Sequence, residues 1–167
     1  MRMPGQSILI TGASSGIGLE LARCFANEQF ANDNGQLILV ARNTAALESL
    51  AAELRQEWKV TVNILPADLS QPKTPERIFT ELSAQGIPVD VLVNNAGFGA
   101  IGVFDQLPLE RQIEMIQVNV TALTEMTRLF LPGMIQRRGG GILNVASVAG
   151  FVPGPRRAHA ANASSQR

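Results

Sequence analysis

Short apolar runs alternate with longer stretches of helical period along the first part of the chain. The runs SILIT, at residues 7–11, and QLILVA, at residues 36–41, each precede a longer segment. In those segments, GLELARCFANEQF and TAALESLAAELRQEW, apolar side chains recur every three or four positions. The pattern predicts the order strand, helix, strand, helix.

The alternation continues from the second helical segment to the run GILNVAS, at residues 141–147. Between these two stretches lie VTVNILPA, PERIFTELSAQ, VDVLVNN and a long helical segment from about Leu109 to Gln136. The expected strands are rich in Val, Ile and Leu and lack polar alternation, which is typical of strands that are buried on both faces. We therefore predict an α/β fold. It is a doubly wound parallel sheet of about five strands, ordered 3-2-1-4-5, with helices on both faces.

Composition narrows the class of protein. The chain has 167 residues, of which 46% are hydrophobic and 17% charged, and its 14 basic side chains balance 14 acidic ones. This suits one compact domain, and it predicts no nucleic-acid partner because no general charge attracts one. We expect no membrane partner and a cytoplasmic location, since no apolar run is long enough for a membrane span. No metal site is expected. The single Cys24 lies at helical spacing, which predicts a buried thiol.

A glycine-rich stretch follows the first expected strand directly and leads into a helix. It reads TGASSGIG, from Thr11 to Gly18. Gly12 permits a tight turn, Gly16 lets the backbone approach a pyrophosphate, and Gly18 lets the helix pack closely on the strand. The pattern indicates a phosphate-binding loop, and a plain strand-to-helix turn is the alternative. A nucleotide-hydrolysing P-loop is disfavoured, because the Gly-Lys-Ser/Thr ending is absent.

If the phosphate-binding loop holds a nicotinamide dinucleotide, the end of the second expected strand bears on the choice between NAD and NADP. Ala41, Arg42 and Asn43 stand there, and none is a carboxylate that would accept hydrogen bonds from the ribose of NAD. The guanidinium of Arg42 is suited to the additional phosphate of NADP, although an arginine at a strand end is also an ordinary surface residue. We expect NADP rather than NAD, with the hydroxyl of Ser14 on the same phosphate.

Two motifs together carry a family resemblance. TGxxxGxG matches residues 11–18 at every fixed position, and NNAG matches residues 94–97 at the end of a later strand. In both motifs the chain resembles the short-chain dehydrogenase/reductase (SDR) family. The resemblance extends over about Ser7 to Pro153. The resemblance implies a Rossmann-like domain that binds NAD(P) at residues 1–153, and residues 154–167 are expected to form a disordered tail. The implied cofactor-binding residues are Gly12, Ser14, Ser15, Gly16, Ile17, Gly18, Arg42, Asp68, Leu69, Asn95, Ala96 and Gly97.

Asp68 has two compatible interpretations. The resemblance implies a contact with the adenine ring, whereas the sequence alone also predicts an N-cap for the helix that contains PERIF.

The resemblance implies hydride transfer between the nicotinamide and a small carbonyl or alcohol. Ser147 matches the serine that polarises the substrate oxygen, and Asn119 matches the asparagine that completes a water relay. The family's catalytic tyrosine and lysine have no counterparts. Their positions hold Ala160 and Ser164, the sequence contains no tyrosine, and no lysine follows Lys73.

We therefore expect a C-terminally incomplete, truncated SDR-type oxidoreductase that retains part of the NADP site and does not catalyse. The family continues past this point, and the last residues resemble that passage after a frame change or premature end. The alternatives are a nucleotide-sensing or interaction protein on the same fold, and a working enzyme with His159 as its acid. The helix over residues 109–136 carries more apolar positions than one sheet face can cover, which predicts self-association.

Overall fold

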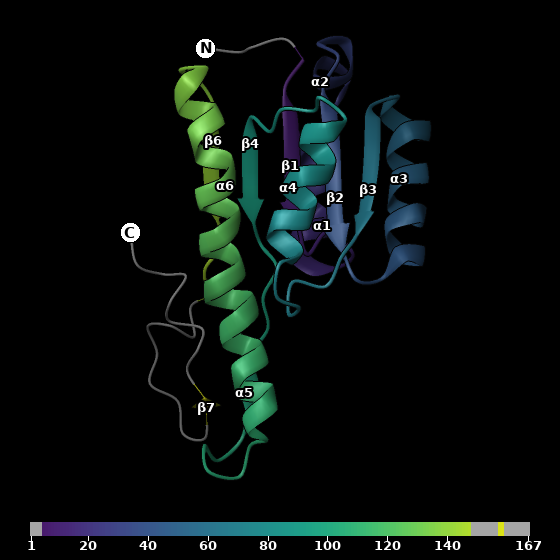
Figure 1. Ribbon diagram of the computed structural model, residues 1–167. Helices are drawn as coiled ribbons and strands as arrows, with labels where there is room; N and C mark the ends of the chain where they lie inside the picture. Colours follow the sequence, from purple (N-terminus) through teal and green to yellow (C-terminus); the bar gives the residue numbers. More distant parts are fainter. Residues whose placement is uncertain (1–4, 148–156, 159–167) are drawn as a thin grey trace.

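The apolar runs form a five-stranded parallel sheet at the centre of the molecule (Figure 1). The structure is a computed structural model, and it describes residues 5–147 and 157–158. The strands are β1 (Ser7–Thr11), β2 (Gln36–Ala41), β3 (Thr61–Pro66), β4 (Val91–Asn94) and β6 (Gly141–Asn144). Their order is β3-β2-β1-β4-β6, with every pair parallel. Because β6 is the fifth of these strands along the chain, the predicted order is confirmed.

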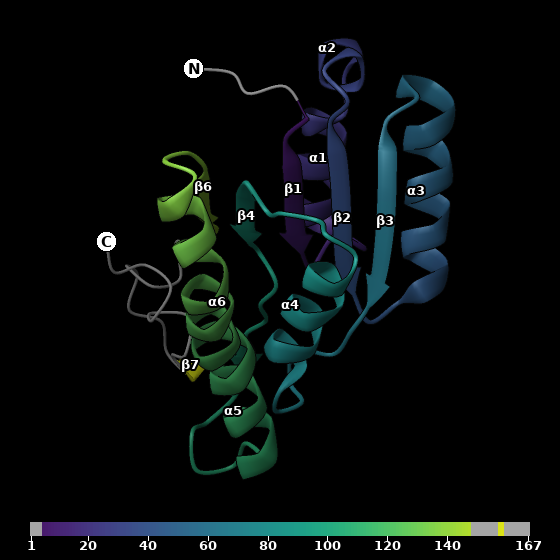
Figure 2. The same cartoon turned by 45° about the horizontal axis from the view of Figure 1, so that its top comes forward.

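Helices cover both faces of the sheet (Figures 1 and 2). The helices are α1 (Gly16–Phe25), α2 (Glu28–Asn32), α3 (Thr44–Trp58), α4 (Thr74–Ala84), α5 (Leu109–Ile116) and α6 (Leu123–Gln136). Buried residues of α1 and α3 share one apolar cluster with the sheet, and those of α4 and α6 share the other. The fold is therefore doubly wound, as predicted.

The side chains of β1 divide between the two clusters. Ile8 and Ile10 pack toward α1 and α3, and Leu9 packs toward α4 and α6. The predicted burial on both faces thus holds for the central strand. It does not hold for β6, where Leu143 is 42% exposed, because β6 is the edge of the sheet in the described part of the chain.

The long helical segment forms over the predicted range but not as one regular α-helix. A π-helix, η1 (Gln117–Ala122), joins α5 to α6 without a break. An insertion of this kind rotates the residues on either side of it relative to an α-helix, and it is frequent at functional sites. The apolar side chains on the two sides of η1 differ in burial: Met126 and Phe130 of α6 are buried, whereas Ile113 of α5 is 56% exposed.

Cys24 is exposed, so the prediction of a buried thiol is wrong. The helix α1 turns Gly18 and Ala22 toward the core, and Cys24 lies about 200° around the helix from Ala22. Helical spacing alone did not tell which face packs against the sheet.

One short strand pair was not predicted. β5 (Ala100–Ile101) pairs antiparallel with β7 (Arg157–Ala158), so two residues of the expected tail lie in a strand. The rest of residues 154–167 lies outside the described residues. Among the described helices, none has the length and apolar character needed to cross a membrane.

Candidate functional site

A cleft of about 620 Å³ opens where the strands of the central sheet end at their carboxyl sides. Its walls come from the glycine-rich loop, the segments after β2, β3, β4 and β6, and η1. Every predicted site residue except Gly18 lines this cleft. Parallel topology explains the convergence, because the carboxyl ends of all the strands meet at one edge of the sheet.

The three glycines of the loop meet different needs. Gly12 and Gly16 have positive φ angles of 68° and 56°, which favour glycine. A Cβ on Gly12 would lie 2.8 Å from Asn95 Nδ2 and 2.9 Å from Ala96 Cα, and one on Gly18 would collide with the Gly12 carbonyl oxygen. A Cβ on Gly16 would meet nothing within 4 Å. Gly12 and Gly18 therefore allow close packing, whereas Gly16 keeps open space beside the backbone.

Thr11 fixes the end of β1 against the end of β4. Its hydroxyl donates to the Val93 carbonyl at 3.2 Å and accepts from the backbone N–H of Asn95 and of Ala96, both at 3.0 Å. The Asn95 side-chain amide donates to the Thr11 carbonyl at 2.9 Å. These bonds hold the NNAG segment beside the glycine-rich loop. Thr11 is the first residue of the motif, but the sequence alone does not predict these hydrogen bonds.

Asn94 connects the sheet to α6. The residue is buried, and its Nδ2 donates to Thr127 Oγ1 at 3.1 Å and to Asn144 Oδ1 at 3.0 Å. The side chain therefore links β4, β6 and α6 at the floor of the cleft.

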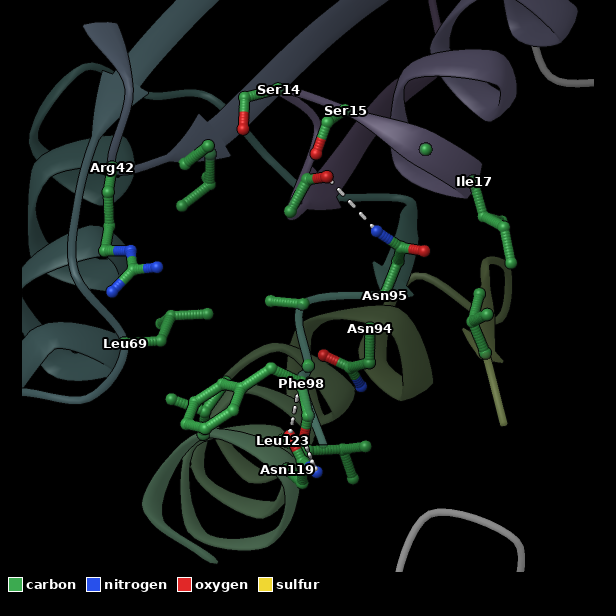
Figure 3. A pocket seen from close by; sticks show the side chains of 18 of the residues that line it. Ser14, Ser15, Ile17, Arg42, Leu69, Asn94, Asn95, Phe98, Asn119 and Leu123 are labelled. Atoms are coloured by element: carbon green, nitrogen blue, oxygen red, sulfur yellow. Dashed lines mark hydrogen bonds between the residues drawn. The ribbon is translucent and has the colours of Figure 1, made fainter. Parts of the chain in front are cut away.

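Polar side chains around the cleft suit phosphate groups. Figure 3 shows Ser14, Ser15 and Arg42 around one open space, with the hydroxyl groups and the guanidinium directed into it. Ser15 stands at the N-cap of α1, and its side chain makes no capping hydrogen bond. The first amides of a helix attract anions, so the loop offers both hydrogen-bond donors and a favourable dipole.

Asp68 does not cap α4, so that interpretation of the sequence is wrong. Its Oδ1 accepts from the backbone N–H of Ser70 at 3.0 Å, and α4 begins later, at Thr74, with Lys73 at its N-cap. The local hydrogen bond forms a turn instead. Asp68 and the buried Leu69 line the cleft after β3, and their contact with adenine stays a prediction.

Both predicted catalytic residues line the cleft. Asn119 is buried in η1, and its side chain bonds the Phe98 backbone twice (Figure 3). Ser147 is exposed and lines the cleft just beyond β6. Ala160, Ser164 and His159 lie outside the described residues.

Apolar wall residues were missed by the sequence reasoning. Phe98, Val118 and Leu123 line the cleft. Phe98 directly follows the NNAG motif, so its position after a strand end was an available signal. Val118 lies in η1 and Leu123 follows it directly, and no feature of the sequence predicts a π-helix there. Among residues 5–147, no group of three or more His, Cys, Asp or Glu side chains could hold a metal ion.

The residues of the cleft fit a nicotinamide dinucleotide. Open space beside Gly16 adjoins the N-terminus of α1, where a pyrophosphate would sit. Apolar side chains on the facing wall suit an adenine ring, and Arg42 lies at the rim.

Comparison with known proteins agrees with this geometry. The chain is 40% identical over 151 residues to an NADP-dependent 3-hydroxy acid dehydrogenase of Schizosaccharomyces pombe, covering 89% of this chain and 56% of that protein. It is 35% identical over 167 residues to a very-long-chain 3-oxoacyl-CoA reductase of Phaeosphaeria nodorum, covering 92% and 48%. The chain thus spans about half the length of the curated relatives it matches.

A solved structure shows the same fold. A short-chain dehydrogenase from Sphingobium yanoikuyae in complex with NADPH superposes with a TM-score of 0.82 at 37% identity, covering 95% of this chain and 60% of that one. The family model described as short chain dehydrogenase matches residues 6–163. The chain therefore belongs to the short-chain dehydrogenase family.

Proposed function

We propose that this chain binds NADP(H) in its cleft, as the cofactor-binding part of an NADP-dependent oxidoreductase. The observation that carries the proposal is the position of Arg42 at the rim of a cleft that also contains the glycine-rich loop. Two relatives support it, since the protein from Schizosaccharomyces pombe is named NADP-dependent and the structure from Sphingobium yanoikuyae holds NADPH.

The residues divide among the parts of the cofactor. The loop from Gly12 to Gly18 would hold the pyrophosphate, with Ser15, Gly16 and Ile17 nearest to it. Arg42 and Ser14 would bind the additional phosphate of NADP. Asp68 and Leu69 would contact the adenine, and Asn95, Ala96 and Gly97 would complete the cleft wall.

Bound NADPH would supply a hydride for a carbonyl, and the protein would have to supply a proton. Ser147 would polarise the carbonyl oxygen of the substrate. Asn119 would hold the segment that contains Phe98 in position. The sequence has no tyrosine and no lysine after Lys73. Positioned proton transfer contributes a factor of about 10² to 10⁴. We therefore propose that the 167-residue chain binds the cofactor without useful turnover.

Calorimetric titration with NADPH and NADH, beside an assay of NADPH oxidation with a panel of ketones, tests this function. We expect NADPH to bind more tightly than NADH, with no turnover. Absence of NADPH binding would refute the proposal. Turnover that disappears in His159→Ala would make His159 the acid and would show a working enzyme.

One observation favours a second candidate, a nucleotide-sensing interaction protein. On α5, Leu109, Ile113 and Ile116 are 66%, 56% and 45% exposed, and they recur at helical spacing on one face. A protein partner whose affinity changes with NADPH would favour this function.

A cytoplasmic location stays a prediction, and fractionation of cells that express the tagged chain would test it.

A further inference from the structure

Arg42, which lines the cleft, lies within ion-pair distance of an acidic residue on α5. Its Nη1 is 3.7 Å from Oε1 of Glu114, which lies on α5. This distance is too long for a good hydrogen bond, so the attraction is mainly Coulombic. The Arg42 side chain is 65% exposed. In the part of the chain that the structure describes, Glu114 is the only ion-pair partner of Arg42.

Glu114 is held more firmly than Arg42. Its other oxygen, Oε2, accepts from Arg111 Nη1 at 2.7 Å, and its side chain is only 28% exposed. The Arg111 guanidinium lies 3.8 Å from the centroid of the Phe98 ring, in a cation–π contact. The Phe98 backbone is fixed in turn by Asn119. Arg111 thus holds Oε2 of the Glu114 carboxylate in place, and Oε1 is the oxygen that lies near Arg42.

We propose that Glu114 is a specificity-determining residue, and that it lowers the preference of the cleft for NADP(H) over NAD(H). This inference rests on the proposed function, in which Arg42 binds the additional phosphate. In the free chain Glu114 pairs with the arginine that would bind this phosphate. With the phosphate on Arg42, the same carboxylate becomes a nearby like charge. NAD(H) has no phosphate at this position, so its binding is not opposed.

The size of the effect follows from the exposure of the pair. Exposed ion pairs of this kind change an equilibrium by about two- to fivefold, and repulsion of the phosphate adds to this. Removal of the charge at Glu114 should therefore tighten NADPH binding by about two- to fivefold or slightly more. Salt should reduce the gain, because the screening length falls from about 10 Å at 0.1 M to about 3 Å at 1 M.

The test is calorimetric titration of the full chain and of Glu114→Gln with NADPH and with NADH. We expect a tighter NADPH complex, an unchanged NADH complex, and a gain that shrinks as NaCl is raised. Adenosine 2′,5′-bisphosphate and AMP differ by the same phosphate, and they should give the same change in ratio. Glu110→Gln is the matched control, because it removes an exposed charge from the same helix and should leave the ratio unchanged.

Two further variants separate specificity from folding. Glu114→Asp keeps the charge and draws the carboxylate back by one methylene, so we expect a smaller gain. In Arg42→Ala, the added change Glu114→Gln should gain less than it does in the parent chain, because the two effects are coupled. A merely structural role of Glu114 would lower the melting temperature without moving the ratio of the two affinities.

The outcomes distinguish this inference from the function on which it rests. If the parent chain binds no NADPH, both are overturned. If Arg42→Ala leaves NADPH affinity unchanged, this inference and the assignment of the additional phosphate to Arg42 fail, whereas NADPH binding by the chain stands. If Arg42→Ala weakens NADPH binding but Glu114→Gln leaves the ratio unchanged, the inference alone fails. It also fails if Glu114→Gln weakens NADPH binding, since Glu114 would then hold Arg42 in position to bind the phosphate.

Discussion

Asn119 and Phe98 form a reciprocal pair of hydrogen bonds. Asn119 Nδ2 donates to the Phe98 carbonyl at 2.9 Å, and the Phe98 N–H donates to Asn119 Oδ1 at 3.1 Å. A Cβ on Gly97 would lie 3.1 Å from the same Oδ1, so the segment after β4 fits closely on η1. Both polar atoms of the Asn119 side-chain amide therefore already bind the Phe98 backbone. If Asn119 took part in a water relay, it would have to do so through its backbone carbonyl.

The first prediction concerns this pair. Asn119→Ala should lower the free energy of unfolding by about 1–3 kcal/mol, because the partly buried Phe98 N–H and carbonyl lose their partners. Urea unfolding measures the change. Gln117→Ala is the control, since Gln117 lies in the same π-helix and its side chain makes no hydrogen bond in the described part of the chain. Equal losses in both variants would contradict the prediction.

Arg42→Ala should weaken NADPH binding by about 1–3 kcal/mol, through loss of a charge-assisted contact, and should leave NADH binding nearly unchanged. Titration calorimetry gives both affinities. Arg128→Ala removes the same charge from an exposed position on α6 outside the cleft, and it should change neither. Equal losses for NADPH and NADH in Arg42→Ala would show that Arg42 does not bind the additional phosphate.

Gly16→Val should weaken NADPH and NADH binding alike, because its side chain would enter the space of the pyrophosphate. Gly86 offers a close control. Its φ of 66° resembles the 56° of Gly16, and a Cβ on either would meet nothing within 4 Å. Both valine variants should lose about 1–2 kcal/mol of stability to backbone strain, and only Gly16→Val should lose nucleotide affinity. Normal binding by a folded Gly16→Val protein would refute the assignment of the loop.

The exposed side chains of α5 should cause self-association through the 109–136 helix. Leu109 and Ile113 are 66% and 56% exposed on one face. The double variant Leu109→Lys/Ile113→Lys should be less associated than the parent chain in sedimentation velocity, because the apolar patch is interrupted by charge. Ile135→Lys, an equally exposed site near the end of α6, should change little. A parent chain that stays monomeric at high concentration would contradict this expectation.

The Arg23–Glu53 pair between α1 and α3 gives a pH dependence. Arg23 donates to both carboxylate oxygens of Glu53, at 2.7 Å and 2.8 Å. The hydrogen bonds from Arg23 lower the pKa of Glu53 below its ordinary value. A lowered folded-state pKa contributes stability above the unfolded-state pKa, and this stability is lost as the pH falls through the folded-state pKa.

Glu53→Gln should therefore be less stable than the parent chain at pH 7, and the difference should shrink below about pH 4. Urea unfolding of both proteins at pH 7 and below about pH 4 measures this difference in stability. Glu57→Gln, on an exposed position of the same helix, should show no such trend. A difference that grows toward acid pH would have the wrong sign.

Local sequence determined much of the fold and of the site. Apolar runs such as SILIT and QLILVA favour strands, because they are short, contain β-branched residues and are bounded by turn residues, and right-handed crossovers then permit few orders of a parallel sheet. The glycine-rich loop is also local, because positive φ at Gly12 and Gly16 depends mainly on the residue type. Strand ends meet at one edge of such a sheet, so the sequence could place nearly all of the candidate site there.

Contacts between distant segments decided the rest. The rotation of α1 on the sheet leaves Cys24 exposed, and the π-helix turns Val118 into the cleft. The side chain of Asn119 is hydrogen-bonded to the backbone of Phe98, and Glu114 meets Arg42 only because the fold brings α5 close to the end of β2. Hydrophobic periodicity tells that a helix has an apolar face. The packing of that helix against its neighbours fixes which side chain each polar group meets.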